Sequence, residues 1–126
     1  TGIERSVCMY TLRIPLKPVS LNSAYMVGKG SNFTLSKQGK KFKEDCQDFL
    51  REQFTKKPLE GKLKVDILFQ LYSFREKIDL DNMLKLTMDS MTGIVYKDDS
   101  QVYRIETEKQ IGMKRDEIHI FIDEID

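Results

Sequence analysis

The sequence predicts an α+β fold, a single domain over residues 1–126 in which helices pack on a mixed β-sheet to form two layers. Two observations lead to this prediction. Apolar side chains alternate with a period of two in four segments and recur at helical spacing in two others. These segments follow one another in the order β-α-β-α-β-β, and 126 residues are enough for one core but too few for two ordinary domains.

The first predicted strand covers residues 8–14, where Tyr10, Leu12 and Ile14 share one face. Residues 15–35 then contain two prolines, two glycines and two asparagines. This composition predicts a long loop, of a length that is usually functional or disordered inside a compact domain.

Two helices and three further strands complete the prediction. Ser36 is a suitable N-cap for a helix whose apolar residues share one face: Phe42, Cys46, Phe49, Leu50 and Phe54. Residues 63–71 alternate as a strand, and a second helix runs from Leu80 to Met91 and ends at Gly93. Strands over residues 101–109 and 117–125 follow, joined by a turn at 112–116.

Several function classes lack support in the sequence. Cys8 and Cys46 have no nearby Cys or His partner, so we expect two buried, reduced thiols rather than a disulfide or a zinc site. The chain has one histidine, His119, which gives no support to Ser-His or Cys-His nucleophilic chemistry. There is no signal-like start and no bilayer-spanning apolar run, so we expect a soluble cytoplasmic protein without a membrane partner.

Charge is distributed unevenly along the chain. Residues 1–78 carry 15 Lys and Arg against 8 Asp and Glu, whereas residues 79–126 carry 6 against 12. A basic part can bind a phosphate backbone and an acidic part can bind divalent cations, which are the two needs of a metal-dependent nuclease. Ordinary solvated charge is the alternative interpretation of the same composition.

Four aspartates lie at the ends of predicted elements. Asp79 and Asp81 stand two residues apart where a strand passes into a helix, so both can project to one side, and Lys85 follows Asp81 by one helical turn. Asp98 and Asp99 directly precede a later strand. The connection after Gly93 is long enough to return along a helix of roughly 15 Å and bring the two pairs together.

Carboxylates gathered in this way favour a hard divalent ion. Mg²⁺ prefers carboxylate oxygens and binds with few protein ligands when substrate phosphates complete its octahedron. One or two such ions would activate water and offset the charge of a phosphodiester under attack. The aspartates also have structural explanations as helix caps and turn residues, and a bare Asp-x-Asp occurs in glycosyltransferases and phosphotransferases too.

Taken together, the motifs resemble the RusA family of Holliday junction resolvases. The resemblance is carried by Asp79-Leu80-Asp81-Asn82-Met83-Leu84-Lys85, by Asp89-Ser90-Met91-Thr92-Gly93 and by Asp98-Asp99-Ser100-Gln101-Val102. It extends more loosely to Pro18 and Asn22 with Tyr25, and to residues 34–36 with Gly39.

This resemblance implies roles for particular residues. Asp79, Asp81 and Asp99 would hold a catalytic Mg²⁺, with Mn²⁺ as a substitute, and Asp98 occupies the neighbouring place in the motif. Lys85 matches the family's important lysine and would steady the phosphate or orient the water. An i, i+4 pair between Lys85 and Asp81 is its structural alternative.

The resemblance also implies partners and a biological setting. We expect a crossover junction endodeoxyribonuclease that acts as a homodimer on branched DNA, nicking two strands of a four-way junction symmetrically in DNA recombination and repair. A two-fold dimer would present two equivalent sites to two equivalent strands. A bacterial or phage source, as in a prophage, is expected.

We expect the basic part of the chain to contact DNA. Tyr25 and Phe33 have two alternative interpretations, stacking on bases of an opened junction or packing in the core. The candidate phosphate contacts are Lys29, Lys37, Lys40, Lys41, Arg75 and Lys77.

Two other functions remain open on the sequence. One is a protein of the same fold that binds branched or single-stranded DNA without cutting it. The other is an enzyme that uses the same aspartates on a nucleotide or sugar phosphate, although no Gly-rich phosphate loop is visible.

Overall fold

The four-stranded sheet is mixed, as predicted. The computed structural model describes residues 9–19, 25–27 and 33–125, without the side chains of residues 25–34. The strand order is β1 (Met9–Ile14), β6 (Glu117–Ile125), β4 (Lys62–Gln70) and β5 (Val102–Gln110). β4 pairs with β5 in parallel, while β1–β6 and β6–β4 are antiparallel.

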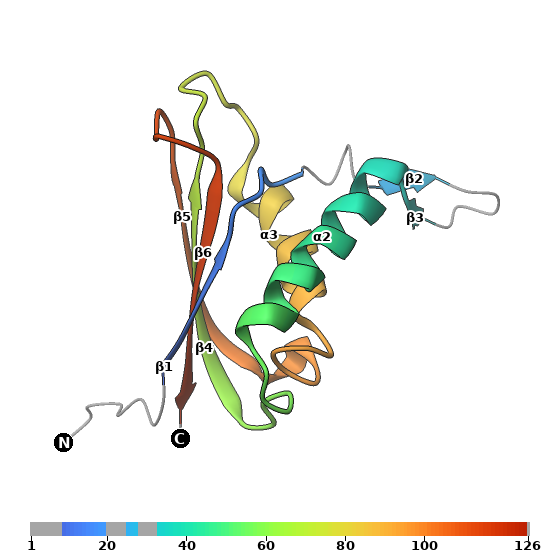
Figure 1. Cartoon of the computed structure of the whole chain (residues 1–126), viewed down its shortest axis with the longest axis vertical. Helices are drawn as coiled ribbons and strands as arrows, with labels where there is room; N and C mark the ends of the chain where they lie inside the picture. The colour runs from blue at the N-terminus through green and yellow to red at the C-terminus, as the bar shows by residue number, and fades with distance from the viewer. Residues whose placement is uncertain (1–8, 20–24, 28–32, 126) are drawn as a thin grey trace.

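Two helices cover one face of this sheet, α2 (Lys37–Gln53) and α3 (Leu80–Met91), as Figure 1 shows. The parallel β4–β5 pair requires a crossover, and α3 forms part of it. The predicted two-layer α+β architecture and the order of its main elements are therefore confirmed.

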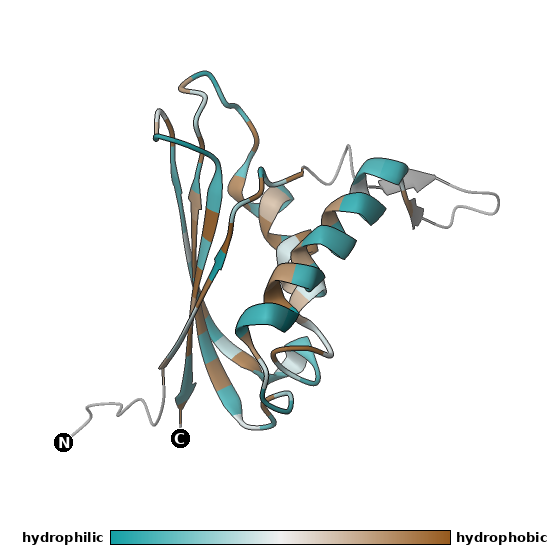
Figure 2. Cartoon of the chain, in the orientation of Figure 1, coloured by the Kyte–Doolittle hydropathy of each residue, from teal (hydrophilic) through white to brown (hydrophobic). Residues whose placement is uncertain are grey.

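The hydrophobic core lies between the sheet and the helices. Alternate residues of β4 are buried, from Leu63 to Phe69, and β6 contributes Ile118, Ile120 and Ile122. The same alternation appears as bands of brown and teal along the strands in Figure 2. Phe42, Cys46 and Leu50 of α2 are buried against the sheet, as their helical spacing predicted.

Local signals set the helix ends. Ser36 caps α2, because its hydroxyl accepts a hydrogen bond from Gly39 N at 3.1 Å. Gly93 follows the end of α3 with φ +87°, a left-handed conformation that side chains disfavour, so glycine suits this position. Both ends were predicted from the sequence.

The long loop or excursion predicted over residues 15–35 contains two strands that the sequence did not predict. Two short strands, β2 (Tyr25–Val27) and β3 (Phe33–Leu35), pair antiparallel beside the start of α2. Three-residue strands are too short to show a clear period of two, so side-chain alternation could not reveal them.

Cys46 is a free, buried thiol, as expected, and burial raises its pKa to about 12. Cys8 lies outside the described residues.

Neither helix of the described chain has the length and hydropathy needed to cross a lipid bilayer.

Candidate active site

Asp79 lies at the N-cap of α3 and is exposed to solvent. Its backbone carbonyl accepts hydrogen bonds from Asn82 N at 3.1 Å and Met83 N at 3.3 Å. Its carboxylate makes no capping hydrogen bond, although capping is the common structural use of aspartate at this position. The Asp79 carboxylate is therefore not used to cap α3.

Three charged side chains follow along one face of α3, because residues four apart lie one above the other on a helix. Asp81 is in the first turn, and its Oδ1 accepts a hydrogen bond from Asn82 N at 3.0 Å. Lys85 stands one turn further on, and its Nζ lies 4.0 Å from Oδ2 of Asp89. The lysine thus lies between two carboxylates, and its recorded ion pair is with Asp89.

The connection after α3 turns back against the C-terminal half of that helix. Tyr96 is fully buried, and its hydroxyl donates a hydrogen bond to the carbonyl of Met88 at 2.8 Å. Burial raises the pKa of Tyr96, and the charges of Asp99, Asp89 and Asp98 raise it further. The carboxylates of the loop therefore lie near the Asp89 end of α3.

Asp98 has a structural task in this loop. It is the N-cap of the short 3-10 helix η2 (Asp99–Gln101), where its carboxylate accepts hydrogen bonds from Ser100 N and from the Ser100 hydroxyl. These bonds lower the pKa of Asp98. The Gln101 side chain completes the capping box and also donates to the carbonyls of Leu59 and Gly61, at 2.8 and 3.0 Å.

A groove of about 360 Å³ runs between α3 and the edge strand β5. Tyr103 and Ile105 of β5 are exposed here, and β5 is an edge strand of the sheet that the described residues form. The groove is lined by Asp81, Leu84, Lys85, Met88, Asp89, Asp99, Val102, Tyr103, Arg104 and Ile105. The lining thus combines charged with apolar side chains, and Asp79 and Asp98 are not among the lining residues.

The predicted site residues are therefore only partly brought together. Asp81, Lys85 and Asp99 all line the groove. However, Asp81 lies eight residues before Asp89 on α3, which is about 12 Å along the helix axis. Within the described part of the chain, no three His, Cys, Asp or Glu side chains are close enough to hold one metal ion. The assignment of metal ligands stays a prediction.

The donor chemistry of the groove nevertheless fits Mg²⁺. This ion is commonly bound by one or two carboxylates together with waters and substrate phosphates, rather than by a cage of protein ligands. Asp81 and Asp99 offer carboxylate oxygens on the groove wall. A site of this open kind needs the substrate to complete it.

The sequence interpretation did not assign Asp89, Tyr103 or Arg104 to the site. Asp89 could have been found, since it stands four residues after Lys85 and eight after Asp81 and so shares their helix face. Tyr103 and Arg104 gave no such signal, because their place on the groove depends on where α3 packs against β5.

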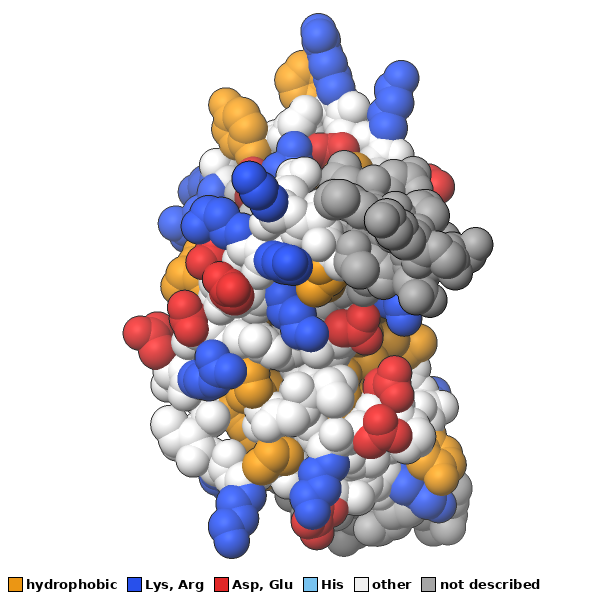
Figure 3. Space-filling model, turned by 90° about the vertical axis from the view of Figure 1, so that its right-hand side faces the viewer, with side chains coloured by type: hydrophobic (Ala, Val, Ile, Leu, Met, Phe, Trp, Pro, Cys, Tyr) orange, Lys and Arg blue, Asp and Glu red, His pale blue; other side chains and the backbone are white. Residues whose placement is uncertain are grey.

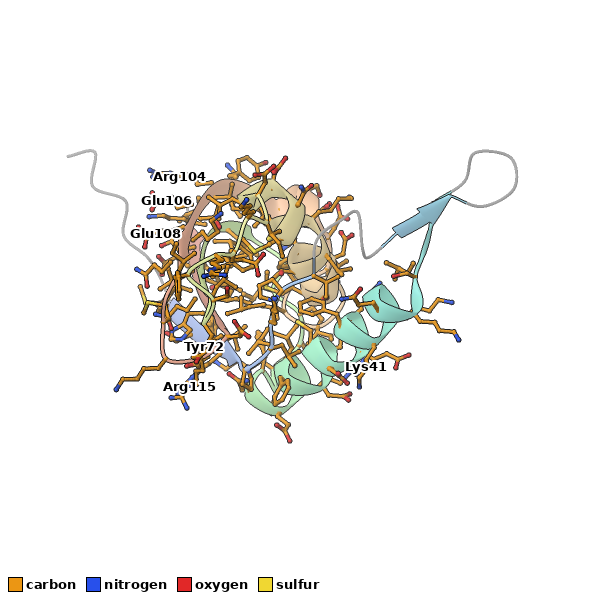
Figure 4. The ribbon with its side chains drawn as sticks, turned by 90° about the horizontal axis from the view of Figure 1, so that it is seen from above. Lys41, Tyr72, Arg104, Glu106, Glu108 and Arg115 are labelled. Carbon is orange, nitrogen blue, oxygen red and sulfur yellow. The ribbon has the colours of Figure 1, made fainter. Side chains whose placement is uncertain are left out.

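The predicted DNA contacts are exposed wherever they are described. Lys37, Lys40 and Lys41 lie in the first turns of α2, and Lys41 Nζ is 3.1 Å from Asp45 Oδ2. Seen from above in Figure 4, Lys41 lies on the helix side of the molecule, opposite the row formed by Arg104, Glu106 and Glu108. Arg75 and Lys77 are exposed on the connection into α3, and Lys29 lies outside the described residues.

A groove lined by carboxylates and a lysine can hold a divalent cation, and a lysine-rich helix end can bind a phosphate backbone, which together suit an enzyme that cuts phosphodiesters. Sequence comparison agrees with this class. The profile of the family described as endodeoxyribonuclease RusA matches residues 15–123, and the chain belongs to this family. It is also 28% identical over 94 residues to the crossover junction endodeoxyribonuclease of Enterobacteria phage HK97, covering 75% of this chain and 76% of the relative.

Proposed function

We propose that this nuclease cuts four-way DNA junctions and related branched DNA in a Mg²⁺-dependent reaction, as part of DNA recombination and repair. The observation that carries the proposal is the groove that Asp81, Lys85 and Asp99 all line. Membership of the endodeoxyribonuclease family and the junction-cutting name of the phage relative support the substrate.

The residues have distinct proposed tasks. Asp81 and Asp99 would hold Mg²⁺ at the groove, and Asp79, whose carboxylate makes no capping bond, would be a further ligand. When bound, the ion supplies neutralisation of phosphate charge and activation of the attacking water. Lys85 donates a hydrogen bond to a phosphate oxygen and so holds the scissile phosphate against the groove.

The exposed cations orient the DNA on the protein. Lys37, Lys40 and Lys41 contact phosphates at one place, and Arg75 and Lys77 contact them beside the start of α3. Such contacts are sequence-independent, which suits an enzyme that selects a branched shape.

We also propose a homodimer that makes paired nicks in strands related by the two-fold axis of the junction. A supercoiled plasmid with an extruded cruciform tests this arrangement. Paired nicks linearise the plasmid, whereas independent single nicks accumulate open circles. Sedimentation of the free protein gives its mass in solution and reports the dimer separately. A bacterial cytoplasm, where a phage enzyme meets branched DNA, is the proposed location, and the phage relative supports it.

The decisive experiment compares wild type with Asp81→Asn on a labelled four-way junction, with Mg²⁺ for cleavage and with EDTA for binding. Cleavage is expected to be lost, while binding is kept or strengthened because a negative charge near the DNA has gone. Asp48→Asn is the matched control, since Asp48 is an exposed aspartate of α2 that pairs with Arg51 away from the groove.

Two outcomes would contradict the proposal. Normal cleavage by Asp81→Asn would remove the proposed metal ligand. A wild-type protein that shifts the junction but leaves it intact under all conditions would instead be a branched-DNA-binding protein.

A further inference from the structure

A patch of exposed apolar side chains lies at the end of the sheet from which the chain enters α3. Tyr72 and Phe74 follow β4 and are 66% and 69% exposed, and Ile111 follows β5 and is 45% exposed. We call these three residues the apical patch. Figure 3 shows hydrophobic side chains flanked by Lys and Arg at the upper end of the molecule. Large exposed apolar groups gathered in this way are typical of interaction sites.

The two connections that carry the apical patch are fixed to each other. Met113 N donates to the carbonyl of Leu71 at 2.9 Å, and Tyr72 N donates to Asp116 Oδ1 at 2.8 Å. Gly112 has φ +69°, and a Cβ there would meet Phe74 Cβ at 3.6 Å, so the two turns are in contact. Aromatic side chains held on braced turns lose little freedom when a ligand binds.

The charge around the apical patch is positive. The guanidinium of Arg75 lies 5.6 Å from the centre of the Phe74 ring. Lys114 and Arg115 are exposed on the turn after Ile111, and Arg115 also forms an ion pair with Glu117, with 2.7 Å between Nε and Oε1. Among the acidic groups nearby, Glu76 forms an ion pair with Lys17 at 3.0 Å and Glu117 forms one with Arg115, while Asp116 accepts a hydrogen bond from the Tyr72 amide.

Aromatic faces surrounded by cations match one class of ligand especially well. Nucleic acid presents flat bases, which stack on aromatic rings, next to phosphates, which bind Lys and Arg. Bases within a continuous duplex are already stacked on each other, whereas bases at a branch point or in a single strand are available.

We propose that the apical patch stacks on unpaired or unstacked bases at the branch point of the DNA, with Phe74 as the main stacking ring and Arg75 and Lys114 on the adjoining phosphates. The substrate class rests on the proposed function. Because the chain continues from this patch through Lys77 directly to Asp79, stacking there would also set which phosphate reaches the groove.

Binding measurements without metal test the stacking apart from cleavage. The probes are a short single strand of DNA and an abasic strand of the same length, both in EDTA, with a four-way junction carrying 2-aminopurine at its branch point. Phe74→Ala is expected to bind the base-containing strand about 5- to 150-fold more weakly, because one aromatic–base stack is lost. Its affinity for the abasic strand is expected to equal that of wild type.

Two further variants make the result specific. Phe74→Leu keeps an apolar side chain without an aromatic face and is expected to bind as poorly as Phe74→Ala. Met9→Ala removes a side chain that is 59% exposed on β1, away from the apical patch, and is expected to bind like wild type. Wild type should quench 2-aminopurine in the junction, and Phe74→Ala should not.

Several results would overturn the stacking. Normal binding by Phe74→Leu would mean that an apolar contact suffices. Equal losses on base-containing and abasic strands would place the contact on the backbone. A change of oligomeric mass in Phe74→Ala, with base-dependent binding intact, would assign the patch to a second copy of the chain.

The stacking and the proposed cleavage can fail separately. If wild type does not cut junctions but Phe74→Ala loses base-dependent binding, the proposed cleavage is refuted and the stacking is supported.

Discussion

Lys85 and Asp89 form an ion pair on the groove-facing side of α3, with 4.0 Å between Nζ and Oδ2. The pair has i, i+4 spacing, and its lysine side chain is 60% exposed against 31% for the aspartate. An exposed pair of this kind contributes little to stability. Its significance is positional, because both of its residues line the groove that Asp81 and Asp99 also line.

Asp89→Asn is expected to reduce junction cleavage by roughly 10- to 100-fold, because a displaced lysine no longer holds the phosphate in place. Binding in EDTA and thermal stability should change little. The matched control is Asp45→Asn, which removes the i, i+4 partner of Lys41 on α2 and should not impair cleavage. Equal cleavage by Asp89→Asn and wild type would show that Lys85 is positioned without this aspartate.

Tyr96→Phe tests how the returning loop is held. The variant loses the hydrogen bond to the Met88 carbonyl and leaves that acceptor without this donor, so stability should fall by about 1 kcal/mol. Cleavage should fall as well, since the same loop carries Asp99. Urea denaturation measures the first effect and junction cleavage the second. The control is Tyr72→Phe, which changes an exposed tyrosine and should leave stability unchanged. If Tyr96→Phe is as stable as wild type, the Tyr96 hydroxyl does not hold the loop.

Gly93→Ala isolates a backbone effect at the end of α3. Space is available, because nothing lies within 4 Å of an added Cβ, but φ is +87°. The variant should therefore be less stable by about 1 kcal/mol, as judged by urea denaturation. Gly61→Ala is the control, since its Cβ also has open space and its φ is outside the left-handed range. If the two variants are equally stable, the left-handed conformation at position 93 does not destabilise a residue that has a side chain.

The buried carboxylate of Glu117 should make the stability of the fold depend on pH. This carboxylate is almost completely buried, and the hydrogen bond from Arg13, helped by Arg115, lowers its pKa from 4.5 to about 2. A carboxylate with a lowered pKa stabilises the fold above its ordinary pKa, and the contribution disappears as the pH falls from about 4.5 to about 2.

Glu117→Gln should therefore be less stable than wild type at pH 7, by about 1 to 2 kcal/mol. The difference should shrink below pH 4.5 and vanish near pH 2. Urea denaturation across this range provides the measurement, with Glu52→Gln on the exposed side of α2 as a control that stays near zero. A difference that persists unchanged to pH 2 would exclude ionisation of Glu117 as its cause.

The main elements were predictable because their signals lie in neighbouring residues. Alternation from Leu63 to Leu71, the Ser36 cap and Gly93 each depend on local chain geometry. The ribbon of β2 and β3 was missed because each strand is only three residues long.

Prediction of the site was weaker for a physical reason. The sequence selected Asp81, Lys85 and Asp99, which do share a groove, but the return of the chain to the Asp89 end of α3 depends on where Tyr96 is buried. The resemblance assigned Asp99 as a metal ligand and gave Asp98 the neighbouring place in the motif. The structure adds a physical difference between them, because the capping bonds from Ser100 occupy the Asp98 carboxylate while Asp99 lines the groove.

By itself, the sequence determined the α+β class, the order of the main elements and the acidic motifs on α3 and before β5, since side-chain periodicity and short motifs are properties of adjacent residues. Tertiary structure decided which carboxylates face one groove and which aromatic turns meet at the end of the sheet. Those relationships join residues that are distant in the chain, and they arise only when the core has packed α3 against β5 and closed the two connections on each other.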